Sequence, residues 1–287
     1  MLTLGLIGTM ILAGCGRTSD ADESMTKLRI GVLPDESREI LARRFEPMRA
    51  YLEATTGIPC ELITPDSYET LLSRFIGGEI DFAYFGGYTF VVAREEIGAV
   101  PLVLRPEDRQ FVSYCLVAGT STATSVDDLA GARLAFGSKL STSGHLMPRY
   151  FLDQEGVTPE KHFGEIRYTG SHDATARAVR DGEVDVGYAN ALIIDAMLRD
   201  GRLAEDDIRV LYETPPYTDY VWAVRPEISD DVKRDLTDAF LALDPERDDH
   251  HAILRAVDAS AYFPAAPNEF DAIALTVERM AGFEDAR

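Results

Sequence analysis

The chain has 287 residues, which suits one large domain or two lobes of ordinary size. Apolar residues make up 46% of the sequence, enough for a packed core and too few for a protein that lies mostly within a membrane. The formal net charge of −21, from 28 basic and 49 acidic residues, repels nucleic acids and anionic lipids, so we exclude nucleic-acid binding as a function.

Residues 1–14 form an uncharged segment rich in Leu, Ile, Gly and Ala. It is too short to span a bilayer as a helix and is typical of a signal peptide. The segment ends in Leu12-Ala13-Gly14-Cys15, which resembles the lipobox of bacterial lipoproteins. That resemblance implies cleavage before Cys15, acylation of its thiol, and an extracytoplasmic, membrane-anchored location in the periplasm or at the cell surface. The lipidated Cys and a polar, acidic, flexible tether then make up residues 15–27.

Strands and helices alternate along the chain that follows. Apolar residues recur at helical spacing between residues 37 and 56, and Gly57 is placed to end that helix. A second helix is predicted at 68–76. The predicted strands of this half lie at residues 28–33, 60–64, 80–85, 100–104 and 114–118.

The second half repeats the order of strand, Gly/Ser-rich loop and helix. A buried strand at 133–137 leads into residues 138–144 and then a helix to about 154, and a strand at 166–168 leads through Gly170 into a helix to about 180. Further strands are predicted at 184–188, 208–212 and 220–224, and the rest of the chain is mostly helical. This alternation predicts an α/β fold with mostly parallel sheets flanked by helices.

Ligands of open α/β sheets bind where loops leave the carboxyl ends of strands, and the candidate loops are residues 66–68, 86–88, 138–144, 170–173 and 215–219. The third of these contains Ser141-Thr142-Ser143-Gly144. The first turn of a helix offers free N–H groups and the positive end of the helix dipole. Three consecutive hydroxyls add donors without charge, and Gly144 allows close approach of the backbone. The segment is therefore predicted to bind an anion. The alternative is that it is an ordinary helix N-cap.

Four other polar residues lie beside predicted strand ends. His172 could donate to an oxyanion, or it could be a surface or capping histidine. Asp219 could accept a proton from a P–OH group, or it could be a solvated turn residue. The hydroxyls of Tyr68 and Tyr114 could donate neutrally, although tyrosines near strands often belong to the core.

Serine, histidine and aspartate together also suggest a hydrolase. No serine lies in a Gly-x-Ser-x-Gly sequence, and Ser141 or Ser143 would need His172 or His145 as its base. The sequence has neither a Walker A motif nor a Cys/His cluster with zinc spacing, so we expect neither a cofactor nor a metal.

Two motifs resemble those of the phosphate-, phosphite- and phosphonate-binding proteins of ABC transporters. Residues 136–148, FGSKLSTSGHLMP, are similar to the central motif of the family, and Thr169-Gly170-Ser171-His172-Asp173 are similar to the second. Weaker similarities occur at 66–68, 81–86 and 215–221, within a total span of about 28–263.

The resemblance implies the two-lobed periplasmic-binding-protein type II fold with the ligand in the cleft between lobes. Lobe 1 would comprise residues 28–113 plus 220–287, and lobe 2 residues 114–219. It also implies a monomer that delivers a small oxyanion to an ABC permease for uptake. Carried over by position, the ligand-binding residues are Tyr68, Tyr114, Ser141, Thr142, Ser143, His172 and Asp219.

Two departures from the family pattern bear on the ligand. Members that bind aminoethylphosphonate carry an acidic residue just beyond the strand at 184–188, where this chain has Ala189-Asn190-Ala191-Leu192. This favours phosphite, phosphate or a short alkylphosphonate.

Cys115 lies beside Tyr114, and relatives that sense arsenite for a histidine kinase use a cysteine, so an arsenite sensor is the alternative. Neighbours on a strand face opposite sides, which argues against both residues facing one cleft. The sequence does not decide whether Cys60 and Cys115 form a disulfide.

Overall fold

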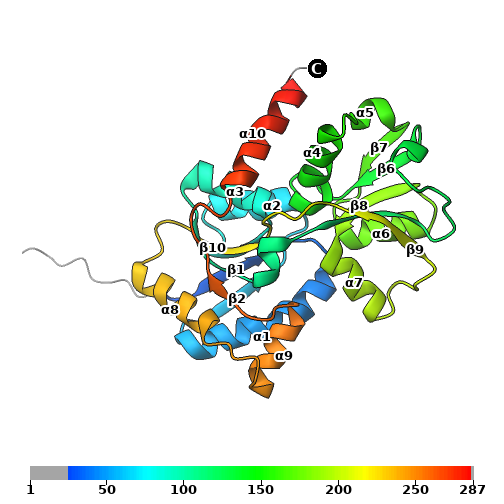
Figure 1. Cartoon of the computed structure of the whole chain (residues 1–287). Helices are drawn as coiled ribbons and strands as arrows, with labels where there is room; N and C mark the ends of the chain where they lie inside the picture. Colours follow the sequence, from blue (N-terminus) through cyan, green and yellow to red (C-terminus); the bar gives the residue numbers. More distant parts are fainter. Residues whose placement is uncertain (1–24, 286–287) are drawn as a thin grey trace, which may run out of the picture.

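The computed structural model of the chain describes residues 25–285, so the predicted signal peptide, Cys15 and most of the tether lie outside the described residues. Two α/β lobes lie side by side, each built around its own sheet (Figure 1). Within residues 25–285, no helix combines the length and the apolar character needed to cross a membrane.

The first sheet has the strand order β11-β4-β10-β3-β1-β2. Its strands are β1 (Leu28–Val32), β2 (Cys60–Ile63), β3 (Phe82–Phe85), β4 (Val100–Leu104), β10 (Val221–Val224) and β11 (Phe263–Pro264). The helices of this lobe are α1 (Arg38–Thr56), α2 (Tyr68–Ile76), α3 (Gly87–Ile97), α8 (Asp230–Leu241), α9 (Asp248–Ala256) and α10 (Asp271–Asp285). At the centre of its core, Trp222 stacks on Phe82 with ring centroids 4.8 Å apart.

The second sheet has the order β7-β6-β8-β5-β9. Its strands are β5 (Ser113–Ala118), β6 (Arg133–Phe136), β7 (Glu165–Tyr168), β8 (Val186–Asn190) and β9 (Ile208–Glu213). The helices are α4 (Met147–Gln154), α5 (Pro159–His162), α6 (His172–Arg180) and α7 (Ala191–Arg199), with a π-helical turn at Thr142–Leu146 before α4. Two apolar clusters cover the two faces of this sheet.

The sheets are mixed, which corrects the prediction of mostly parallel sheets. β1 runs parallel to β2 and β3, and β6 runs parallel to β7 and β8. However, β10 is antiparallel to both of its neighbours, and so is β5. The reason is that the chain crosses from β4 into β5, and from β9 into β10, between the two sheets. β5 and β10 therefore enter their sheets from the edge at which the parallel strands end, and run in the opposite direction to those strands.

The strands divide between the sheets close to the predicted lobe boundaries. β5 begins at Ser113 in the second sheet, and β10 begins at Val221 in the first. The lobes also touch, because Leu146 and Met147 of the second lobe pack into the apolar core of the first. On the same side, Arg279 of α10 donates to Asp153 at 2.9 Å. The exact limits of the two lobes stay a prediction.

Three helices, the short α5 and the longer α3 and α7, have no counterpart among the sequence predictions. α3 has the sequence GYTFVVAREEI, and most of its residues through Ala93 are buried. A helix that is apolar on most sides lacks the periodicity by which an amphipathic helix is recognised. α7 begins ALII and is similarly apolar. The omission matters because the N-terminus of α3 reaches the site described next.

Candidate functional site

Four helical segments begin at one place between the lobes: α2 and α3 from the first, and the π-helical turn and α6 from the second. The Tyr88 N–H in the first turn of α3 donates to Thr142 Oγ1 at 3.0 Å. The Tyr68 hydroxyl at the start of α2 lies 3.5 Å from His172 Nε2 at the start of α6. The positive ends of helix dipoles therefore gather at the junction between lobes, which favours an anion.

Ser141 begins the π-helical turn as its N-cap, and its hydroxyl accepts from Gly144 N–H at 2.9 Å. The turn is wide, because Leu146 N–H donates to Ser141 C=O, five residues back, at 3.0 Å. A Cβ at position 144 would lie 3.0 Å from His172 Cε1 and 2.9 Å from Ser141 Oγ. Glycine at this position therefore allows the imidazole to pack directly against the turn.

His172 is held as a neutral donor. Its Nδ1 accepts a hydrogen bond from Asn190 N–H at 3.1 Å, so the ring proton lies on Nε2, the atom that faces Tyr68. Burial lowers the pKa of His172 to about 4. The imidazole thus presents an N–H to the space between the lobes without adding a positive charge.

Asp219 is fixed from the backbone of the first lobe. Its Oδ1 accepts from Gly87 N–H at 2.7 Å and from Tyr220 N–H at 3.0 Å. Burial raises the pKa of Asp219 to about 6, although its hydrogen bonds with Gly87 and Thr142 act in the opposite direction. The carboxyl group can therefore exchange a proton in the physiological range.

Strained backbone lies directly after this aspartate. Tyr220 has φ of +27°, a value that a bulky residue rarely adopts. Its side chain is secured at the far end, where the hydroxyl donates to Asp35 Oδ2 at 2.9 Å and accepts from Asn190 Nδ2 at 2.8 Å. Burial raises the pKa of Asp35 to about 7. The hydrogen bonds to the hydroxyl thus hold a conformation that presents Asp219.

The cluster formed by Tyr68, Ser141, Thr142, Ser143, His172 and Asp219 is buried, each residue being at most 2% exposed. It contains hydroxyls, one imidazole N–H and one carboxyl group, and none of its members is Lys or Arg. An open groove of about 560 Å³ follows the boundary between the lobes and ends at Tyr68. Since the cluster itself is covered, a ligand could reach it only if the lobes part.

The members of this cluster are six of the seven predicted ligand-binding residues. Ser143 belongs to it through a hydrogen bond with the hydroxyl of Tyr217. Tyr114 does not, and its hydroxyl donates to Asp195 Oδ2 of α7 at 3.3 Å instead. The reason is the alternation of β5: the preceding Ser113 is the residue that turns toward the cluster, with its Oγ 2.5 Å from the Tyr217 hydroxyl. Tyr114 therefore lies apart from the cluster, and its part in ligand binding stays a prediction.

Cys115 is also remote from the cluster. It is fully buried in the core of the second lobe, between the hydroxyls of Tyr188 and Tyr212, and burial raises the pKa of its thiol to about 12. Cys60 belongs to the core of the first lobe, and both thiols are free, so the disulfide left open by the sequence is not formed. Among the described residues, no group of three or more His, Cys, Asp or Glu side chains is arranged to hold a metal ion.

Several contributors to the site were not named individually as contacts from the sequence. They are Asp35, the N–H groups of Gly87 and Tyr88, Asn190, Tyr217 and Tyr220. Residues 86–88 and 215–219 were expected as loops at the carboxyl ends of strands, but no contact was assigned to Gly87, Tyr88 or Tyr217. The two tyrosines flank Asp219 within four residues, but a turn sequence does not tell which way its side chains point.

Comparisons of the sequence and of the structure with known proteins identify similar proteins. Residues 30–270 match the family profile described as the periplasmic substrate-binding protein of the phosphonate ABC transporter. A probable ABC transporter phosphite-binding protein, PhnD1 of Prochlorococcus marinus (strain MIT 9301), is 28% identical over 85% of this chain and 86% of its own length. The phosphate-import protein PhnD of Mycolicibacterium smegmatis is 26% identical over 78% and 77%, respectively. The structure of P. marinus PhnD1 in complex with methylphosphonate matches with a TM-score of 0.84 at 26% identity, over 90% of this chain and 99% of that one.

The environment of Asp219 predicts a specific dependence of stability on pH. Because the pKa is raised to about 6 in the folded protein from 3.8 in the unfolded chain, Asp219 binds more protons when folded. Its contribution is therefore fully present below about pH 4 and is lost as the pH rises to about 6, by roughly 3 kcal/mol. Asp219→Asn keeps an Oδ1 for the two backbone N–H groups but cannot titrate.

The measurement is urea unfolding of both proteins at several pH values without ligand. The free energy of unfolding of the wild type, minus that of Asp219→Asn, should fall between about pH 4 and pH 6. A difference that stays constant over this range, or rises, would show that Asp219 is not held as described.

Proposed function

The chain belongs to the family of periplasmic substrate-binding proteins of phosphonate ABC transporters, and from its site we propose that it binds a small phosphorus oxyanion for uptake. The candidate ligands are phosphite, phosphate and a short alkylphosphonate such as methylphosphonate. The observation that carries the proposal is the meeting of helix N-termini from both lobes around neutral donors and Asp219. The names of the relatives in P. marinus and M. smegmatis support the same class of ligand.

Each group in the cluster has a role in this proposal. Hydroxyls of Tyr68, Ser141 and Thr142 and the Nε2–H of His172 donate to the oxyanion, as do N–H groups of the first helical turns. Asp219 accepts from a protonated oxygen of the ligand. A carboxylate would repel an anion that carries no proton, so Asp219 selects phosphorus oxyanions that keep one and disfavours sulfate, which has lost both at neutral pH.

The surroundings of Asn190 favour a ligand without an amine. Its Oδ1 accepts from Ile193 N–H at 3.1 Å and its Nδ2 donates to the Tyr220 hydroxyl at 2.8 Å. Both polar ends of the amide are thus engaged within the protein. No carboxylate stands at this position to neutralise an ammonium group, which supports phosphite, phosphate or methylphosphonate over an aminoalkylphosphonate.

The two alternative functions have less support. A serine hydrolase needs a histidine that can accept the serine proton, whereas the His172 proton already lies on the nitrogen that faces the cluster. An arsenite sensor needs a reachable thiolate, whereas Cys115 is fully buried with a raised pKa. We therefore propose a binding role without catalysis.

Family membership places the protein outside the cytoplasm, with an ABC permease as its partner. We further propose that Cys15 is acylated after cleavage of residues 1–14 and anchors the chain, and that the protein acts as a monomer. The apolar segment ending in Leu-Ala-Gly-Cys supports the first point.

Binding of a panel of oxyanions tests the ligand class. Isothermal titration calorimetry at neutral pH should detect phosphite, phosphate or methylphosphonate, and thermal unfolding should shift upward with the bound anion. Sulfate and aminoethylphosphonate should be bound at least about 100-fold more weakly, because each leaves a charge in the closed cluster without a partner. Heat with arsenite alone, abolished in Cys115→Ala, would replace this proposal by the sensor.

Substitutions in the second lobe test the donors. Thr142→Ala and His172→Ala should each weaken binding of the preferred anion by roughly 1–3 kcal/mol, because each removes a hydrogen bond to a charged group. Tyr114→Phe serves as the matched control, because the structure places that hydroxyl on Asp195. A loss in Tyr114→Phe equal to that in His172→Ala would contradict this description of the site.

Expression with and without the cysteine tests the anchor. In a bacterial host that processes lipoproteins, the wild type should fractionate with membranes and incorporate labelled palmitate at Cys15. Cys15→Ser should lose the label and appear in the soluble fraction. Equal amounts of label in both proteins would reject acylation at this residue, whatever the ligand.

A further inference from the structure

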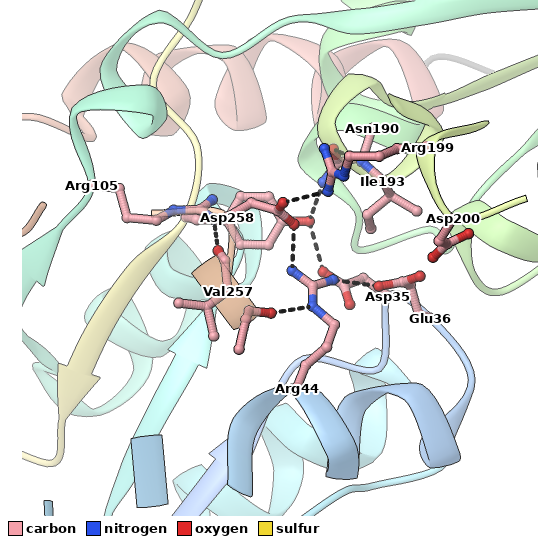
Figure 2. A network of polar contacts seen from close by, with 12 residues as sticks. Asp35, Glu36, Arg44, Arg105, Asn190, Ile193, Arg199, Asp200, Val257 and Asp258 are labelled. Atoms are coloured by element: carbon pink, nitrogen blue, oxygen red, sulfur yellow. Dashed lines mark hydrogen bonds and ion pairs between the residues drawn. The ribbon is translucent and has the colours of Figure 1, made fainter. Parts of the chain in front are cut away.

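A network of ion pairs joins the two lobes outside the cluster, beginning at Glu36, one residue after Asp35 (Figure 2). Glu36 of the first lobe has a side chain with no exposure to solvent. One of its carboxylate oxygens contacts Arg44 of α1 in its own lobe, and the other lies 2.5 Å from Arg202 Nη1 of the second lobe. Arg202 is oriented by Asp200, which accepts from its Nε at 2.8 Å.

Asp258 repeats this arrangement beside Glu36. Its Oδ2 lies 3.1 Å from Arg44 Nη2 within the first lobe, and its Oδ1 lies 2.8 Å from Arg199 Nη2 of α7 in the second lobe. The backbone of Asp258 has φ of +50°, a left-handed conformation between α9 and β11 that aims the carboxylate at both arginines. Arg44 thus serves two carboxylates, and each carboxylate reaches one arginine of the other lobe.

We propose that Glu36 and Asp258 of the first lobe, with Arg199 and Arg202 of the second, form an ion-pair latch that keeps the lobes closed over the bound anion. None of the four belongs to the ligand cluster. The latch determines how long the ligand stays, by holding the lobes in the closed position. Its effect on ligand residence rests on the proposed function, whereas its effect on closure does not.

The latch and the cluster are connected by one short loop. Asp35, the neighbour of Glu36, accepts a hydrogen bond from His172 N–H through its backbone carbonyl at 2.9 Å. Its carboxylate accepts from the Tyr220 hydroxyl. Parting the lobes would therefore break the Glu36–Arg202 pair and the Asp35–His172 hydrogen bond together, so closure at the latch and order at the cluster are linked.

The internal partner Arg44 makes such a latch reversible. When the lobes part, Glu36 and Asp258 lose Arg202 and Arg199 but keep Arg44, which lies on their own lobe. Neither carboxylate is then left buried without a cation, a situation that would be strongly unfavourable. The pairs across the boundary are partly exposed, so each adds a modest and salt-dependent attraction.

The test uses the full chain with Arg199→Gln and Arg202→Gln combined. Both changes lie in the second lobe and leave the carboxylates paired with Arg44. Arg180→Gln is the matched control, because Arg180 pairs with Asp181 inside one lobe. A further variant, Arg202→Lys with Arg199 intact, keeps the positive charge and should therefore release the ligand almost as slowly as the wild type. Thermal unfolding without ligand should be alike in all variants, which separates a latch from a folding defect.

Stopped-flow displacement of methylphosphonate, or of phosphate or phosphite if one of those binds more tightly, provides the kinetic measurement. The double variant should release the anion about tenfold faster than the control variant, with an association rate changed less than twofold. The release rate of the wild type should rise with salt, and that of the double variant should not. A double variant that releases the anion at the same rate as Arg180→Gln overturns the latch.

Small-angle X-ray scattering separates the latch from the proposed ligand. At low salt and without any anion, the double variant should have a larger radius of gyration than the wild type and Arg180→Gln. If the wild type binds none of the three anions, the proposed function fails and the scattering alone decides. Equal radii would then overturn the latch, and a larger radius in the double variant would support it.

Discussion

The arrangement of this protein depends on collecting helix N-termini from two sheets at one point, where none of the six cluster residues is Lys or Arg. Helices that follow parallel strands start at the carboxyl edge of a sheet, so two such edges must face each other. The first lobe supplies α2 and α3 and the second supplies the π-helical turn and α6. This opposition requires the chain to cross between lobes after β4 and again after β9, and these crossings make β5 and β10 antiparallel within their sheets. The antiparallel strands of both sheets are therefore a consequence of placing the site between the lobes.

The same constraint explains which parts were predictable from sequence. Each recognised motif is a local unit of strand, polar loop and helix, so Ser141, Thr142 and His172 were found from a few neighbouring residues. The direction of the Tyr114 side chain, away from the cluster, was not predictable because it depends on the phase of β5, which the pairing with β8 and β9 sets. The contribution of α3 escaped because that helix is apolar on most sides. Contacts such as Tyr88 N–H to Thr142 join residues of different lobes, and no local pattern encodes them.

Two carboxyl groups in or beside the site agree with the overall acidity of the chain. Asp219 and Asp35 lie on either side of Tyr220, one bonded to its backbone N–H and the other to its hydroxyl. Burial raises the pKa of both toward neutrality, so each can hold a proton where a surface carboxylate would be ionised. A net charge of −21 therefore need not extend into the cluster, where the local balance is set by neutral donors, helix dipoles and protonation.

Recognition and retention of a ligand are then assigned to different residues. In the proposed binding mode, His172 and Asp219 differ in what they offer to each oxyanion, so changes there would alter the ratio of affinities between ligands. In the proposed latch, Arg199 and Arg202 act only on the position of the lobes, and so they would change the affinity for every ligand by a similar factor. Because Arg44 keeps the first-lobe carboxylates paired in either state, these two arginines can vary without a penalty to folding. Affinity in such a protein can be adjusted to ligand supply without altering which anion is chosen.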